Sequence, residues 1–205
     1  GLLIAFCLIA ALSSIPICAL ASPPRSETHE VTQSPQKNNQ TMLNFRYVRD
    51  PSVKSLLEEA AASFRLGNFK KALAQAEQAF EISKRQPDAL QTAEIAAAVG
   101  KVHLVTGDFE KAKGVLSEAL ELAIDAQSEE VQADVLTSLA LPLSVGGQHQ
   151  QAKELGLRAV TLARKTGSLR VLSRALSSLG NAQTNLGELE AAERNLDEAL
   201  RIAET

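Results

Sequence analysis

A repeat of 40 residues runs through most of the chain and constrains its fold more than any other feature. Four glycines, each 40 positions after the last, mark the repeat: Gly67, Gly107, Gly147 and Gly187. Each glycine is followed five positions later by an alanine, and seven positions after that by a second alanine. A fixed period of this length indicates small modules that stack on one another and complete each other's core.

Each repeat has the pattern of two helices joined at its glycine. Before the glycine, stretches such as 89–105 show long helical patterning without a helix breaker, and after it stretches such as 109–123 place apolar residues at helical intervals. Small residues lie seven positions before each glycine and would let two helix axes approach closely; they are Ala60, Gly100, Ala140 and Gly180. The sequence therefore predicts a series of helical hairpins.

Good helix caps stand where the first helix of each repeat should begin. Asp88, Ser128 and Ser168 lie 40 residues apart, and all three are residue types that favour the N-cap. Asp50 serves the first repeat, and Pro51 after it fits the first helical position. These signals predict an all-α fold, an α-α superhelix over 50–205, with repeats at about 50–87, 88–127, 128–167 and 168–205.

The four repeats resemble the tetratricopeptide repeat (TPR) family. The segments that carry the resemblance are RLGNFKKALAQAEQAF, VTGDFEKAKGVLSEAL, SVGGQHQQAKELGLRAV and NLGELEAAERNLDEAL. The usual period of that family is about 34 residues, so this chain looks like a variety with longer first helices. The resemblance implies a solenoid whose concave groove, lined by first helices, binds a protein or peptide.

The resemblance also implies which side chains line that groove. Carried over position by position, the candidate partner-binding residues are Lys54, Phe64, Arg65, Lys101, Leu104, Asp134, Arg174, Asn181, Thr184 and Asn185. Asparagine and arginine near the end of the groove would hydrogen-bond the backbone of a bound peptide. The alternative is that these positions are ordinary solvated helix surface.

The first 49 residues have a different character from the repeats. Residues 1–21 carry no charge, and their apolar run followed by Ala19-Leu20-Ala21 is typical of a cleaved signal peptide. This predicts export to a periplasmic or extracellular location; the alternative is an uncleaved N-terminal membrane anchor, the only membrane contact expected. Residues 22–49 are rich in Pro, Ser, Asn and Gln and predict a flexible polar linker.

Composition and motifs disfavour several functions. Lys+Arg number 21 against 24 Asp+Glu, so the chain lacks the basic field that nucleic-acid binding needs. It has no HExxH, GxSxG or GxGxxG motif, and we expect no catalytic, cofactor-binding or metal-binding residue, and no cofactor. Two hypotheses remain: an exported, non-enzymatic interaction scaffold, or the N-terminal regulatory or sensor region of a larger enzyme such as a caspase-like CHAT-domain protease. TPR repeats of some exported bacterial proteins precede that domain.

Charges and volumes in the third repeat produce two further expectations. Four acid–base pairs are separated by one full repeat and predict salt links between repeats, or else a dipolar surface that orients a charged partner; they are Glu118 with Arg158, Asp125 with Lys165, Glu130 with Arg170, and Asp134 with Arg174. Gly156 stands where repeats two and four have leucine, which predicts a looser joint in repeat three.

Overall fold

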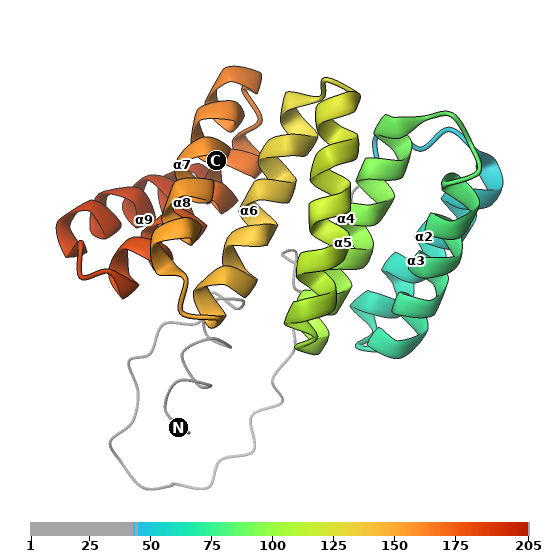
Figure 1. The fold of residues 1–205 in the computed structure, drawn as a ribbon, viewed down its shortest axis with the longest axis horizontal. Coiled ribbons are helices and arrows are strands. Elements are labelled where there is room, and N and C mark those ends of the chain that lie inside the picture. The colour runs from blue at the N-terminus through green and yellow to red at the C-terminus, as the bar shows by residue number, and fades with distance from the viewer. Residues whose placement is uncertain (1–42, 44, 205) are drawn as a thin grey trace, which may run out of the picture. The chain divides into compact units, whose positions relative to one another are not determined.

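The computed structural model describes residue 43 and residues 45–204, so the predicted signal segment 1–21 and most of the predicted linker lie outside the described residues. In the described part, eight α-helices follow one another and no strand occurs (Figure 1). None of these helices combines the length and the apolar character that crossing a membrane would need. The helices are α2 (Pro51–Arg65), α3 (Phe69–Ser83), α4 (Ala89–Thr106), α5 (Phe109–Asp125), α6 (Glu129–Val145), α7 (His149–Thr166), α8 (Leu169–Asn185) and α9 (Leu189–Ala203).

Consecutive helices pair as hairpins, and each hairpin lies within one 40-residue repeat. The four pairs are α2 with α3, α4 with α5, α6 with α7, and α8 with α9. The glycine that marks each repeat lies in the turn inside the hairpin and has a φ between 74° and 80°. Only glycine adopts this left-handed conformation at no steric cost. The periodic glycines are therefore explained by the backbone of the turns.

The expected caps occupy the expected positions but act in different ways. The Asp50 carboxylate accepts a hydrogen bond from the Ser52 N–H at 2.8 Å, and the Asp88 carboxylate accepts one from the Gln91 N–H at 3.0 Å. Ser128 and Ser168 are the N-cap residues of α6 and α8, but their side chains make no capping bond. Both of these helices therefore begin at the predicted position, but no side-chain hydrogen bond caps them.

Close packing inside the hairpins depends on the small residues of the first helices. A Cβ atom added at Gly100 would lie 2.5 Å from Cγ of Leu116, and one added at Gly180 would lie 2.7 Å from Cγ of Leu196. Leu116 is fully buried. Because each of these glycines lacks a side chain, a leucine of the second helix can occupy the space beside it.

In the third repeat, the corresponding close contact is made with the fourth repeat. A Cβ atom added at Gly156 would lie 3.1 Å from Cα of Leu179, which belongs to α8 and is 2% exposed. Leu179 thus fills the space that a leucine occupies in repeats two and four. At Gly156 the joint is closely packed, because the next repeat supplies the missing volume.

The first helices also pack against one another. The helix α6 contacts both α4 and α8 directly, in addition to its neighbours α5 and α7. One side of the stack is therefore a surface built from α4, α6 and α8, which we call the first-helix face.

Two glycine substitutions test this packing, and they should have opposite effects. Gly100→Ala should lower the free energy of unfolding by about 1–3 kcal/mol, because its methyl group would overlap buried Leu116. Gly114→Ala on α5 is the matched control: nothing lies within 4 Å of its added Cβ. It should raise stability by about 0.5–1 kcal/mol through helix propensity. Urea unfolding followed by circular dichroism measures both, and stabilisation by Gly100→Ala would contradict the packing described.

Candidate functional site

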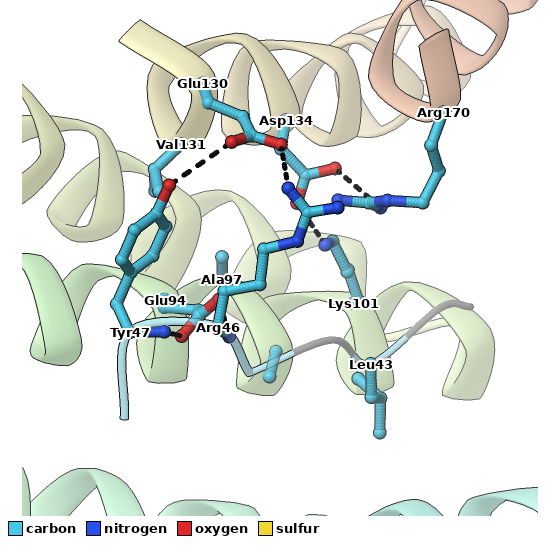
Figure 2. A pocket seen from close by; sticks show the side chains of 11 residues that line it. Leu43, Arg46, Tyr47, Glu94, Ala97, Lys101, Glu130, Val131, Asp134 and Arg170 are labelled. Atoms are coloured by element: carbon cyan, nitrogen blue, oxygen red, sulfur yellow. Dashed lines mark hydrogen bonds and ion pairs between the residues drawn. The ribbon is translucent and has the colours of Figure 1, made fainter. Parts of the chain in front are cut away.

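A short non-helical segment before α2 lies on the first-helix face. We call residues 45–49 the strap. The Glu94 carboxylate, on α4, accepts hydrogen bonds from two consecutive backbone N–H groups of the strap, Arg46 at 2.7 Å and Tyr47 at 2.9 Å (Figure 2). The side-chain oxygen of Gln91, one turn earlier on α4, accepts a third from the Arg49 N–H at 2.8 Å. The strap is thus held mainly through its backbone.

The side chains of the strap reach the next repeat. Glu130, on α6, accepts hydrogen bonds from the Arg46 guanidinium at 3.0 Å and from the Tyr47 hydroxyl at 3.2 Å, one on each carboxylate oxygen (Figure 2). The Ser168 hydroxyl, at the start of α8, donates to the same carboxylate at 2.9 Å. Val48 is buried in the core beside these contacts. The final residues of the predicted flexible linker are therefore attached to the repeats.

Beneath the strap, a buried aspartate joins three repeats. Asp134, on α6, forms ion pairs with Lys101 of α4 and with Arg174 of α8. Arg170, one turn before Arg174, lies 3.9 Å from the same carboxylate. Arg174 also donates to the Ser138 hydroxyl at 3.4 Å. A single carboxylate thus links the second, third and fourth repeats through their first helices.

Burial and charge act in opposite directions on this cluster. Burial raises the pKa of Asp134, but the positive charges of Lys101 and Arg174 outweigh it, so that the pKa lies below its ordinary value. Burial lowers the pKa of Lys101, and the charge of Asp134 opposes that effect. Since each buried charge is compensated by the other, the cluster is a structural ion pair network.

The strap and the cluster enclose a small space. Its volume is about 20 Å³, and its lining includes Tyr47, Glu94, Lys101 and Arg170 (Figure 2). Pockets that bind small molecules are usually about 300–1,000 Å³. Among the described residues, no three His, Cys, Asp or Glu side chains gather as metal ligands would. The interactions at this site are hydrogen bonds that the carboxylates of Glu94 and Glu130 accept from the strap.

The structure joins three of the ten predicted groove residues in one cluster, and the other seven lie outside it. Lys101, Asp134 and Arg174 meet in the ion pair network. Phe64 was predicted wrongly: it is 6% exposed and packs edge-on against Phe69 with ring centroids 5.2 Å apart. Leu104 is half-buried against the core. The remaining five are exposed on α2 or α8: Lys54, Arg65, Asn181, Thr184 and Asn185.

Only one of the four predicted salt links forms as expected. Asp134 pairs with Arg174, but in the described residues the other predicted members pair differently. Lys165 pairs with Glu129, Glu118 lies 3.8 Å from Lys84, and Glu130 pairs with Arg46. Packed helices cross at an angle, so the equivalent residue one repeat away is often not the nearest.

The predicted flexible linker, residues 22–49, included the strap. A signal for an anchored strap was present, because Tyr47 is the only tyrosine of the chain and lies with Phe45 and Val48 at the end of a mostly polar stretch. Two aromatic residues so close to the first helix indicate an anchored segment. Glu94 and Glu130 were visible as charges on first helices, but nothing in the sequence showed that both would bind the same segment.

Comparison with known proteins agrees with this architecture. The sequence matches tetratricopeptide repeat models over residues 53–125 and residues 172–205. The chain belongs to the tetratricopeptide repeat family. No curated protein matches it significantly. The TPR fold and family support a role as a protein-interaction scaffold.

Solved structures share the fold at low sequence identity. BtubC (BKLC) from P. vanneervenii is 23% identical with a TM-score of 0.64, over 77% of this chain and 66% of that one. Aspartyl phosphate phosphatase F from Bacillus subtilis is 16% identical with a TM-score of 0.66, over 77% and 42%. A Rap protein complexed with competence and sporulation factor is 20% identical with a TM-score of 0.67, over 74% and 43%.

These similarities confirm the predicted superhelix of helical hairpins. The chain matches less than two thirds of the length of each of the three proteins.

Removing the charge at the centre of the network should destabilise the protein. Asp134→Asn leaves Lys101 buried without its counter-ion, and we expect a loss of about 3–5 kcal/mol in the free energy of unfolding. The control is Glu198→Gln, which breaks the exposed pair with Arg164 and should cost about 0–1 kcal/mol. Equal effects in urea unfolding at pH 7 would contradict the assignment.

The same variant should show a defined pH dependence. Because the pKa of Asp134 is lowered in the folded protein, its stabilising effect is fully present above the unfolded pKa of about 3.9 and is lost as the pH falls below it. The stability difference between wild type and Asp134→Asn should not fall between pH 7 and about 5, and it should shrink below about 4. A difference that shrinks between pH 7 and 5 would contradict the lowered pKa.

Proposed function

We propose that this TPR chain is a non-catalytic scaffold whose first-helix face binds a segment of a partner protein or a peptide. The observation that carries the proposal is the strap, a non-helical segment that this face holds by consecutive backbone N–H groups. Backbone recognition of this kind gives affinity that does not depend on the bound sequence, while neighbouring side chains add selectivity. The fold shared with a Rap protein complexed with competence and sporulation factor supports the proposal.

Exposed polar residues extend the face beyond the strap. Asn181, Thr184 and Asn185 lie towards the end of α8 and are exposed. Amide side chains donate and accept at once, which suits them to both groups of a peptide backbone. We propose that a bound segment continues from the strap position towards these residues.

We also propose that the protein acts after export. The support is residues 1–21, an uncharged apolar stretch with small residues at a cleavage position. The alternative, an uncleaved membrane anchor formed by the same residues, would place the repeats at a membrane surface. These residues lie outside the described part of the chain.

Selection from a library of linear peptides tests the scaffold function. Peptides selected on the full chain should bind at least about fivefold more weakly to Asn181→Ala and to Glu94→Gln, because each variant removes a hydrogen-bonding group of the face. Lys113→Ala is the matched control, since Lys113 is exposed on the second helix α5. Fluorescence anisotropy measures affinity, and circular dichroism checks that helicity is unchanged. Selected peptides whose affinity falls only with Lys113→Ala would overturn the proposal.

A further inference from the structure

We propose that Glu94 and Glu130 select partner segments that contain an arginine followed by a tyrosine, and that the strap occupies this site in the free protein. The inference rests on the proposed peptide-binding function and names the chemistry of the bound segment. The strap is an intrachain example of that chemistry, because every group it offers to the two glutamates comes from Arg46 and Tyr47.

Glu94 fixes the backbone of the bound pair. Its two carboxylate oxygens each accept one N–H, from Arg46 and Tyr47 respectively. Hydrogen bonds to an ionised carboxylate are about twice as strong as neutral ones. Two consecutive N–H groups on one carboxylate also fix the position of the segment on α4. Glu94 therefore sets which two residues face α6.

Glu130 then identifies those two residues by their side chains. One oxygen accepts from the guanidinium and the other from the phenol. Ser168 donates to the oxygen that also accepts from Arg46, at 2.9 Å, and only 19% of the Glu130 side chain is exposed. A phenylalanine in place of tyrosine would leave one oxygen without its donor. An aliphatic residue in place of arginine would leave the charge unpaired.

The charged side chains around the strap divide into two groups. Lys101 and Arg174 are bonded to Asp134, and Arg170 Nη1 lies 3.9 Å from the same carboxylate without a hydrogen bond to it. Glu94 and Glu130 are instead bonded to the strap. The three acids and three bases at this part of the face cancel in sum, and the cation that the strap adds is the Arg46 guanidinium at Glu130.

The strap competes with any partner because it belongs to the same chain. Tyr47 lies only a few residues before Pro51, where α2 begins. So short a connection gives the strap an effective concentration of about millimolar order. The Arg46 side chain is nevertheless 52% exposed, so its contacts are open to exchange. A partner with the same pair binds when it replaces these contacts.

A labelled peptide with the sequence LNFRYVRD, residues 43–50 and so the strap with its flanking residues, serves as the probe. It is titrated into the full chain, and binding is followed by fluorescence anisotropy. The wild type should bind weakly. The double variant Arg46→Ala/Tyr47→Phe should bind at least about tenfold more tightly, because its own strap competes less well. Equal affinity of the two chains would overturn the inference.

Two further changes test the two glutamates. In the double-variant background, Glu130→Gln should weaken probe binding about tenfold, because it removes the charge that the arginine meets. Glu190→Gln, an exposed acid on α9, is the matched control and should leave binding unchanged. A probe with sequence LNFAFVRD, which alters no residue of the protein, should bind at least about tenfold more weakly than LNFRYVRD. Equal binding of the two probes would contradict the selectivity even where a protein variant folds poorly.

A second copy of this chain is the competing occupant. Light scattering of the wild type should show a monomer, in which each strap lies on its own repeats. A dimer that dissociates in Arg46→Ala/Tyr47→Phe would mean that copies exchange straps, and it would overturn the assignment to a foreign partner.

Failure of the inference is distinguishable from failure of the scaffold function. Library peptides without an arginine–tyrosine pair that still require Asn181 and Glu94 would refute only the former.

Discussion

The close approach of helices at small residues is the constraint on which the rest of this structure depends. Leu116 packs into the space left by Gly100 within a hairpin, and Leu179 packs into the space left by Gly156 between hairpins. These contacts place α4, α6 and α8 side by side. At that spacing Asp134 is reached from both neighbouring repeats at once. A wider spacing would leave a buried carboxylate without its counter-ions, a state that costs several kcal/mol. Apolar packing and the ion pair network therefore require the same spacing of repeats.

The sequence predicted the features that depend on local chemistry. Gly107 marks a turn because its φ of 80° disfavours other residues, and Asp88 begins α4 because its carboxylate caps the helix. Such signals lie within a few residues of the structure they determine. The hairpins and their order followed from the period alone, since the repeat fixes both where helices end and what they pack against.

Features that depend on the angle between helices could not be predicted in the same way. Phe64 has the repeat position of a groove residue, but it is buried against Phe69 and against Val102 near the end of α4. Glu130 was paired by spacing with Arg170, yet it binds Arg46 from the strap. Repeat spacing defines equivalent positions, while contacts depend on the crossing of helices and on segments that lack any period.

The burial of Glu94 explains why the strap belongs on this face and what a partner must provide to replace it. Burial raises the pKa of Glu94, and the N–H groups of Tyr47 and Arg46 lower it. The strap thus compensates part of the cost of placing a carboxylate in a half-buried position. A partner segment must make the same compensation with two consecutive N–H groups. Proline lacks this donor, so a proline at either position would leave one oxygen of Glu94 unsatisfied. The backbone requirement therefore excludes proline from the pair, and the side-chain requirement of Glu130 selects within the sequences that remain.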